Sequence, residues 1–309
     1  MLRVEGLSKS YGKAQAVADV SFQVDAGESF GLLGPNGAGK STTIKLLFGL
    51  LPPDSGTIWV DGRTLAKDPL AVKRCLGYVP QEVALYPELS AQENLRFWGR
   101  LYGLSGQELE RQVAGALEIV GLSDRARGRV STFSGGMKRR INIAAALLHE
   151  PKILIMDEPT VGIDPQSRNH ILETVRSLNA QGMTIIYTSH YMEEVEYLCN
   201  RVGIIDRGRI IACGTVDELR QVVGEDAHLV LNVVGYQESL NDRLLALDEV
   251  KHLTVEGDQL TVVSAVPALA LGAISHLLAE AGVTLRSVQI DEPNLEAVFL
   301  HLTGRALRD

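Results

Sequence analysis

The sequence of 309 residues predicts an α/β fold built around a parallel sheet. Three short apolar runs, at residues 29–33, 153–156 and 184–188, predict strands, because a strand that is covered on both faces is continuously apolar. Each run ends at glycine or at polar residues, and ligands of open parallel sheets bind at the carboxyl ends of the strands. We therefore expect one functional site at which these three strand ends meet.

The composition is typical of a folded soluble protein with room for one large domain and one small one. Hydrophobic residues make up 45% and charged residues 22%, and the net charge of -8 argues against nucleic acid as a partner. Cys75, Cys199 and Cys213 are too far apart for a zinc site or a disulfide framework, which fits a reducing cytosol. The first five residues lack the apolar core of a signal peptide.

The first strand runs into a glycine-rich loop that a helical pattern follows. The loop has the pattern Gly-x-x-x-x-Gly-Lys-Ser, in which backbone N–H groups point at phosphate oxygens. We expect Lys40 to reach the β- and γ-phosphates of ATP and the Ser41 hydroxyl to bind Mg²⁺. The loop residues predicted to bind the nucleotide are Gly34, Pro35, Asn36, Gly37, Ala38, Gly39, Lys40, Ser41 and Thr42.

The second and third strands end in residues suited to hydrolysis of the nucleotide. Asp157 and Glu158 follow the strand at 153–156. Asp157 is placed to hold Mg²⁺, and Glu158 to orient and deprotonate the attacking water. The third strand ends beside His190, which we expect to donate a hydrogen bond to the γ-phosphate. The sequence therefore predicts that the chain binds MgATP and hydrolyses it.

A second glycine motif lies between these strands. Ser134, Gly135 and Gly136 precede a helical pattern over residues 137–149. Two glycines after a serine at a helix start form a second place where backbone N–H groups bind an anion. Alone, the pattern equally fits an ordinary helix N-cap. Its position shortly before the strand at 153–156, together with the basic helix start at Lys138, Arg139 and Arg140, favours anion binding.

Over residues 1 to about 220, these ordered motifs resemble the nucleotide-binding domains of ABC ATPases. The resemblance implies a phosphate-loop ATPase domain with a mixed sheet core and a helical subdomain at about residues 85–150. It implies that Tyr11 stacks on adenine and that Gln81 contacts Mg²⁺ and the lytic water. It also places Asp164 in the loop at the dimer contact, and it assigns catalytic roles to Glu158, His190, Gln81 and Lys40.

The resemblance further implies that two subunits work together. Two identical or similar copies, a homodimer or a heterodimer, pack head to tail and enclose two ATP molecules. Each phosphate loop is then completed by Ser134 and Gly136 of the other copy, so that ATP shifts the population towards the dimer. The common signature reads Leu-Ser-Gly-Gly-Gln, from which Phe133 and Met137 depart. Val161 stands where the dimer loop usually has serine.

The predicted helical subdomain offers a surface to a membrane partner. Ser90 is a plausible N-cap of its first helix. Four apolar side chains on one face of that helix are expected to lie mostly in the subdomain core: Phe97, Trp98, Leu101 and Tyr102. In ABC transporters the groove beside the glutamine loop, which in this chain would be the loop that carries Gln81, receives a helix of the permease. Three residues are candidates for its rim, with ordinary packing as the alternative: Tyr86, Pro87 and Leu89.

Beyond a linker at residues 224–226, residues 225–309 predict a small α+β domain of split βαβ kind. Residues 259–279 carry no charged side chain, but Pro267 and Gly272 interrupt them. We therefore expect a strand and then a helix that begins near Pro267, and no membrane span.

The closing segment predicts a helix with one apolar stripe, ended by Gly304. The stripe comprises Leu295, Val298, Phe299 and Leu302. The segment from Pro293 to Gly304, with the run after Ser134, resembles the ATP-binding subunits of the daunorubicin-resistance and multidrug-export type. Those subunits pair with separately encoded permeases, which implies a peripheral position on the cytoplasmic face of the cell membrane.

Two other kinds of ABC ATPase are alternatives to a transport subunit. DNA-repair members carry long coiled coils between the phosphate loop and the signature, but the stretch between Lys40 and Ser134 shows no sustained heptads. Ribosome-associated factors usually hold two such domains in one chain, and this chain has one phosphate loop. A transport ATPase is therefore the preferred interpretation.

Overall fold

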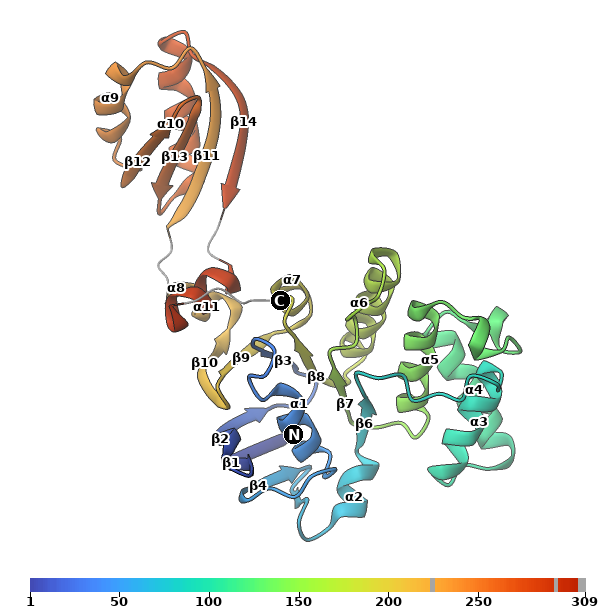
Figure 1. The fold of residues 1–309 in the computed structure, drawn as a ribbon. Coiled ribbons are helices and arrows are strands. Elements are labelled where there is room, and N and C mark those ends of the chain that lie inside the picture. Colours follow the sequence, from blue (N-terminus) through green and yellow to red (C-terminus); the bar gives the residue numbers. More distant parts are fainter. Residues whose placement is uncertain (223–225, 292–293, 305–309) are drawn as a thin grey trace. The chain divides into compact units, whose positions relative to one another are not determined.

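A computed structural model describes residues 1–222, 226–291 and 294–304. The chain forms two compact units, the first from Met1 to Val216 and the second beginning at Asp217 (Figure 1). Most of the predicted linker at residues 224–226 lies outside the described residues, as does Pro293 at the start of the predicted closing segment.

The first unit contains the predicted parallel sheet, with the strand order β10-β9-β3-β8-β7-β6. The strands β9, β3, β8, β7 and β6 are parallel, and β10 pairs with β9 in the antiparallel sense. All residues of β3, β7 and β8 are buried, which confirms the three strands predicted from apolar runs. The bounds are β3 Ser29–Leu33, β6 Leu76–Val79, β7 Ile153–Asp157, β8 Thr184–Ser189, β9 Arg201–Asp206 and β10 Arg209–Thr215.

A second, antiparallel sheet of the first unit has the strand order β2-β1-β4-β5. One hydrophobic core joins the two sheets and helix α1, because Val4, Phe30, Ile44 and Ile155 belong to the same buried cluster. The bounds are β1 Leu2–Tyr11, β2 Ala14–Val24, β4 Ser55–Val60 and β5 Arg63–Thr64. The helices that flank the sheets are α1 Lys40–Leu47, α2 Pro69–Arg74, α6 Pro165–Ala180 and α7 Met192–Leu198.

The helical subdomain lies to one side of the sheets (Figure 1). It contains α3 Ala91–Leu101, α4 Gly106–Ile119, α5 Gly135–Leu147 and the short 3-10 turns at Ser123–Arg125 and Val130–Thr132. The predicted N-cap is confirmed, because the Ser90 side chain accepts a hydrogen bond from the backbone N–H of Glu93 in a capping box.

The expectation that the aromatic residues of α3 lie mostly in the core is wrong. The buried residues of α3 are Ala91, Asn94, Leu95 and Gly99. Small residues on this face let the helices approach closely: a Cβ on Gly99 would lie 2.4 Å from a methyl carbon of Leu109 on α4. The aromatic face therefore points outward, with Phe97 and Trp98 half-buried and Leu101 and Tyr102 exposed.

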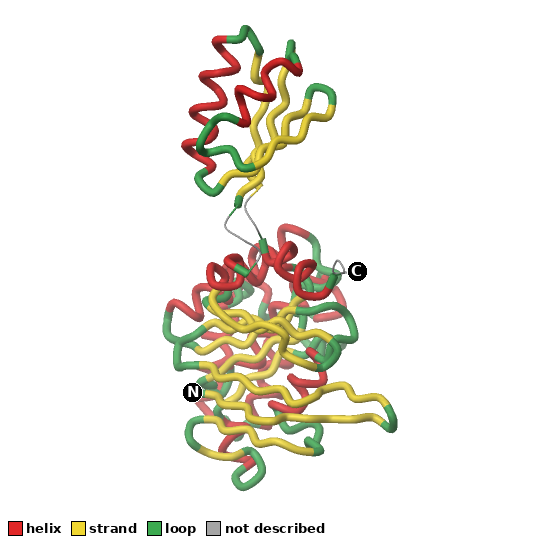
Figure 2. Tube along the Cα trace, turned by 90° about the vertical axis from the view of Figure 1, so that its left-hand side faces the viewer, coloured by secondary structure: helices red, strands yellow, loops and turns green. Residues whose placement is uncertain are grey.

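The second unit has a four-stranded antiparallel sheet with the order β12-β13-β11-β14, and its elements follow one another as βαββαβ. Figure 2 shows its helices on one side of this sheet. Its core joins Leu229, Leu260, Ile274 and Leu278 from the sheet and α10. The bounds are β11 Ala227–Val234, α9 Asn241–Leu245, β12 His252–Glu256, β13 Gln259–Ser264, α10 Pro267–Glu280 and β14 Thr284–Asp291, together with the outlying helices α8 Val216–Gln221 and α11 Leu295–Thr303.

The expectations for residues 259–279 and for the last helix are confirmed. The strand β13 is followed by α10, which begins at Pro267, and none of the described helices is long and apolar enough to cross a membrane. In α11, Leu295, Val298 and Phe299 of the predicted stripe are buried and Leu302 is half-buried, and Gly304 ends the helix with a φ of 68°.

The contact between α5 and α6 gives a prediction about two neighbouring glycines. A Cβ on Gly136 would lie 2.1 Å from Oγ of Ser167, whereas the atom nearest to a Cβ on Gly135 is 3.7 Å away. Gly136→Ala is therefore expected to lower the free energy of unfolding by about 1–3 kcal/mol through overpacking. Gly135→Ala, the matched control, should leave it unchanged or raise it slightly. Urea unfolding measures both values, and equal stabilities of the two variants would contradict this packing.

Candidate functional site

The phosphate loop follows β3 and is closely backed by neighbouring backbone. Gly37 and Gly39 have φ angles of 80° and 108°, which favour glycine. A Cβ on Gly39 would lie 2.4 Å from the carbonyl oxygen of Ala16 in β2, and a Cβ on Gly34 would lie 2.2 Å from that of Ile205 in β9. Three of the glycines are thus required by backbone angle or by space, and the loop curls at the end of the sheet.

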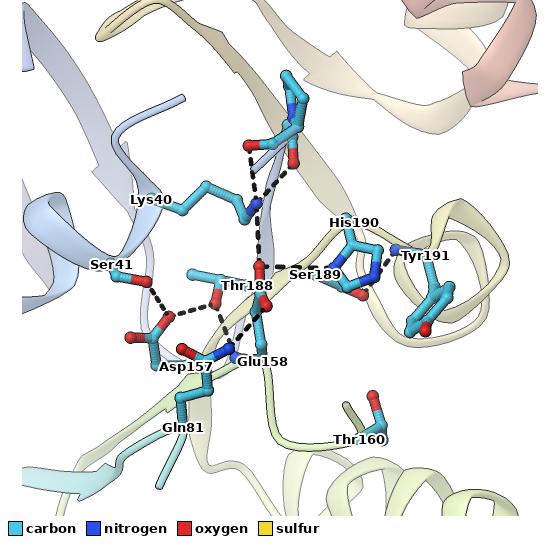
Figure 3. Close-up of polar contacts among 12 residues, drawn as sticks. Lys40, Ser41, Gln81, Asp157, Glu158, Thr160, Thr188, Ser189, His190 and Tyr191 are labelled. Carbon is cyan, nitrogen blue, oxygen red and sulfur yellow. Dashed lines mark hydrogen bonds and ion pairs between the residues drawn. The ribbon is translucent and has the colours of Figure 1, made fainter. Parts of the chain in front are cut away.

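Lys40, the first residue of α1, turns its amine back over this loop (Figure 3). Nζ donates hydrogen bonds to the carbonyl oxygens of Gly34 and Pro35, over distances of 2.6 Å and 3.1 Å. It also lies 3.0 Å from Oε1 of Glu158, and the exposed fractions of the two side chains are 4% and 6%. A buried, paired ammonium therefore stands at the mouth of the loop.

Glu158 is the centre of the polar cluster. Its φ of 45° is unusual for a residue with a side chain and directs the carboxylate to the end of the sheet. Besides Lys40, it accepts a hydrogen bond from Nε2 of Gln81 over 3.3 Å, and Nδ1 of His190 lies 3.5 Å from Oε1. The structure thus brings together the four residues that the sequence predicts to be catalytic (Figure 3).

Asp157 forms a second group of contacts beside Glu158. Its Oδ1 accepts hydrogen bonds from Oγ of Ser41 over 3.1 Å and from Oγ1 of Thr188 over 3.0 Å. Burial raises the pKa of the Asp157 carboxyl, and these two hydrogen bonds only partly oppose that effect. The pair of Asp157 and Ser41 presents two hard oxygen donors side by side, the type of donor that Mg²⁺ prefers.

Sequence reasoning assigned no role to Thr188, which links the two acidic residues. Its hydroxyl donates to Asp157 and accepts the backbone N–H of Glu158 over 2.9 Å. The sequence does place a hydroxyl side chain, Thr188, at the end of the third predicted strand. Its contact with Asp157 follows only if β7 and β8 are known to be neighbours, which the sequence alone does not state.

Sequence reasoning also missed Glu194, a fully buried carboxylate on α7. Its Oε2 accepts hydrogen bonds from the hydroxyl groups of Thr160, Tyr187 and Ser189, over distances of 2.9 Å, 2.8 Å and 2.9 Å. Its Oε1 lies 2.6 Å from Nε of Arg168 on α6. The network ties Ser189, which precedes His190, to Thr160 in the segment that follows Glu158.

The remaining predicted nucleotide contacts lie elsewhere in the first unit. Ser134 caps α5 by accepting the N–H of Met137 over 3.2 Å, and Asp164 caps α6 by accepting the N–H of Ser167 over 2.9 Å. Tyr11 ends β1 and is 50% exposed. Among the described residues, no hydrogen bond or ion pair joins these three side chains to Lys40 or Glu158.

Two neighbouring motifs nevertheless lie side by side. A Cβ on Gly136 would lie 3.6 Å from Oδ2 of Asp164, so the signature glycines and the predicted dimer loop form one surface. Both Ser134 and Asp164 begin helices, where free N–H groups favour anions. The structure therefore keeps the two candidate phosphate-binding regions apart: the loop around Lys40 and the starts of α5 and α6.

Known proteins are similar to the chain over its whole length. Residues 17–161 match the family described as ABC transporter. The linearmycin resistance ATP-binding protein LnrL of Bacillus subtilis is 55% identical, with 100% of both chains covered. The Nod factor export ATP-binding protein I of Paraburkholderia xenovorans is 41% identical over 100% of this chain and 98% of that protein. The daunorubicin resistance ATP-binding protein DrrA3 of Streptomyces coeruleorubidus is 38% identical over 98% and 96%.

Solved structures are similar over about 70% of the chain. The structure of an ATP-binding subunit of an ABC transporter matches with a TM-score of 0.65 and 39% identity, covering 72% of this chain and 93% of that chain. The dimeric post-hydrolysis structure of the cassette MJ0796, bound to ADP and Pi, matches with a TM-score of 0.63 and 26% identity, covering 70% and 98%. The nucleotide-binding fold is thus shared.

The burial of Asp157 predicts that the site is less stable than a neutral version would be. Because burial disfavours the charged carboxylate, Asp157→Asn is expected to raise the free energy of unfolding of the nucleotide-free protein by about 1 kcal/mol at neutral pH. The same change at exposed Asp164, whose pKa is lowered by hydrogen bonds from the Ser167 backbone and side chain, should bring no such gain. Urea unfolding without nucleotide tests both, and a destabilised Asp157→Asn variant would show that the charge is well tolerated.

Proposed function

The chain belongs to the ABC transporter family as an ATP-binding subunit, and from this premise we propose that it powers an exporter through ATP-driven head-to-tail dimerisation coupled to a separate permease. The family hydrolyses ATP. The observation that carries the proposal is the separation of two phosphate-binding regions within one subunit. The cluster around Lys40 and Glu158 lacks the Ser134 motif, and a second subunit would supply it.

In the proposed reaction, Glu158 orients the attacking water and takes its proton, since its carboxylate is the common partner of the catalytic cluster. Lys40 exchanges its bonds to the loop carbonyls for bonds to the β- and γ-phosphates. His190 donates a hydrogen bond to the γ-phosphate, and Gln81 holds the water beside Glu158. Tyr11 stacks on adenine, and residues 34–42 bind the phosphates.

Mg²⁺ fits the donors that the structure presents. Ser41 and Asp157 supply a hydroxyl and a carboxylate oxygen that already lie 3.1 Å apart, and Gln81 is the third proposed ligand. Bound there, Mg²⁺ would neutralise phosphate charge during transfer. It would also compensate the buried Asp157 carboxylate. Protein Mg²⁺ sites commonly use one or two carboxylates and complete their shell with substrate oxygens and water.

The proposed dimer, of identical or similar subunits, joins the two regions in trans. Ser134, Gly135, Gly136 and Asp164 of one copy face the nucleotide held on residues 34–42 of the other. The dimeric MJ0796 structure, bound to ADP and Pi, supports an arrangement with two subunits. Each side contributes part of the phosphate contacts, so that ATP stabilises the closed pair and hydrolysis releases it.

The proposed permease contact lies on the outward aromatic face of the helical subdomain. Tyr86 is 48% exposed and meets the ring of Phe97 edge to face at 4.8 Å. Val83 and Leu101 are also exposed, with fractions of 39% and 64%. Exposed apolar residues that gather on one face indicate an interaction surface. With Pro87 and Leu89, they would form the rim that receives a permease helix at the cytoplasmic face of the membrane.

The names of the relatives support export as the direction of transport. The names of three relatives matched over nearly their whole length refer to linearmycin resistance, Nod factor export and daunorubicin resistance. We propose that the exporter served by this chain removes antibiotics, since two of these names describe antibiotic resistance. A DNA-repair or ribosome-associated role is the alternative, and recovery of DNA or ribosomes in place of a membrane protein would support it.

Replacing the proposed catalytic base should trap the dimer. Glu158→Gln removes proton transfer while the amide keeps the size of the side chain, so ATP turnover is expected to fall by at least about a hundredfold. ATP and Mg²⁺ should then hold the variant as a stable dimer, measured by light scattering after size-exclusion chromatography. ADP provides the control in which the same variant elutes as a monomer. A Glu158→Gln protein that remains monomeric in ATP and hydrolyses it at the normal rate would refute the scheme.

A charge placed on the proposed rim should weaken permease binding without lowering the stability of the subunit. Tyr86→Asp changes an exposed side chain and is expected to alter the free energy of unfolding by less than about 0.5 kcal/mol. The amount of permease that co-purifies from membranes should nevertheless fall several-fold, because an apolar groove rejects the carboxylate. Tyr197→Asp is the matched control, since this tyrosine is 46% exposed on α7, away from the rim. Equal recovery of the permease with both variants would place its contact elsewhere.

A further inference from the structure

We propose that Arg139 is a positioning residue that fixes the glutamine loop to the signature helix, so that Gln81 and Ser134 move as one body. The inference rests on the proposed function, because it assumes that Ser134 meets the nucleotide of a second subunit. Arg139 lies in α5, which Ser134 caps, and its side chain points to the segment that carries Gln81.

The contact is made by both arms of the guanidinium. Nη1 of Arg139 donates to the carbonyl oxygen of Pro80 over 2.6 Å, and Nη2 donates to the carbonyl oxygen of Gln81. The planar guanidinium places two N–H groups in a fixed fork, which fits two successive carbonyl groups. Lysine has a single ammonium and lacks this geometry. The shape of the contact therefore selects arginine at this position.

The environment of Arg139 argues that the contact has a purpose beyond packing. Its exposed fraction is 4%, and no carboxylate of the described residues forms an ion pair with it. The guanidinium is therefore removed from water and bonded to backbone carbonyl groups. Buried ionic groups can often be replaced by apolar residues of similar volume without loss of stability. Retaining it makes sense if the loop must be held by its backbone.

A second contact from the same helix holds the same segment. Asn142 stands one turn after Arg139, and its Oδ1 accepts the backbone N–H of Ala84 over 3.2 Å. Residues three apart on a helix share a face. The segment from Pro80 to Ala84 is thus held at both ends by α5. All of these bonds go to backbone groups of the segment, so they do not depend on which side chains the segment carries.

The clamp continues to the proposed permease rim. Nε1 of Trp98 donates to the carbonyl oxygen of Ala84 over 3.2 Å. The side-chain amide of Asn94 bonds both backbone groups of Tyr86. Its Oδ1 accepts a hydrogen bond from the Tyr86 N–H over 2.7 Å, and its Nδ2 donates to the Tyr86 carbonyl oxygen over 3.0 Å. The rim residue Tyr86 and the signature helix are therefore joined through the loop that carries Gln81. A displacement of α5 would alter the 3.3 Å contact between Gln81 and Glu158.

Steady-state kinetics of Arg139 variants test this inference. Arg139→Gln is expected to lower kcat for ATP by between about tenfold and about a hundredfold, because Gln81 loses its fixed distance to Glu158. The Kd for ATP of the single subunit should stay within about twofold, since residues 34–42 are untouched. Arg139→Lys should restore part of kcat by donating to one of the two carbonyl groups.

Arg140→Gln is the matched control. Its guanidinium belongs to the same helix and donates to the carbonyl oxygen of Val120 over 3.1 Å, but it does not touch the glutamine loop. A thermal melt measures how much stability each variant loses. If Arg139→Gln melts at a much lower temperature than Arg140→Gln, the kcat of Arg139→Lys is compared with that of Arg140→Gln instead. If the Arg139 variants lose no more kcat than Arg140→Gln of equal stability, Arg139 only packs the helix.

The outcome can be separated from a failure of the proposed function. That failure would appear in the Glu158→Gln protein with Arg139 intact, which would not dimerise in ATP. The present inference fails when this dimer forms as proposed but the Arg139 variants keep the kcat of the parent protein. An Arg139→Gln protein with lowered kcat and a full loss of ATP binding would also overturn it, since the defect would then lie in the phosphate loop.

Discussion

The parallel pairing of β3, β8 and β7 is the constraint on which the site depends. In this register Leu33 lies opposite Ser189, and Thr188 lies opposite both Leu32 and Asp157. The phosphate loop, the two acidic residues and His190 therefore leave the sheet at one level. Because all residues of these strands are buried, a register slip would disturb the close packing on both faces of the sheet, and the core thereby fixes the site.

The same sheet end concentrates buried charge, which opposes stability. Lys40 and Glu158 neutralise each other, and Glu194 has Arg168 and three hydroxyl groups. Within the described part of the chain, Asp157 accepts hydrogen bonds from two hydroxyl groups and forms no ion pair, and burial raises its pKa. Burying a carboxylate that no ion pair compensates costs stability. This uneven pairing of charge fits the Mg²⁺ site proposed above, because a bound cation would supply the missing positive charge.

The sequence predicted what local patterns encode and missed what only distant contacts create. Apolar runs marked the three buried strands, and the glycine spacing marked the loop before Lys40, because both signals lie within a few residues. The aromatic face of α3 was placed wrongly, because the packing of Leu95 and Gly99 against other helices decides which side is buried. Thr188 and Arg139 were not assigned roles, since each acts on a segment far away in sequence.

If the two candidate phosphate-binding regions act together as proposed, the contacts between them have to be rigid. Ser134 caps its own helix through the N–H of Met137, so it is held in place before any phosphate arrives. A rigid donor adds little ordering cost on binding. In the proposed dimer, the free energy gained on closure would reach the permease through a segment of backbone that is held rigidly. The segment from Pro80 to Tyr86 fits that requirement, because side chains of α3 and α5 bond its carbonyl and N–H groups at both ends. If mobile side-chain contacts held this segment instead, a displacement of α5 could occur without moving Tyr86.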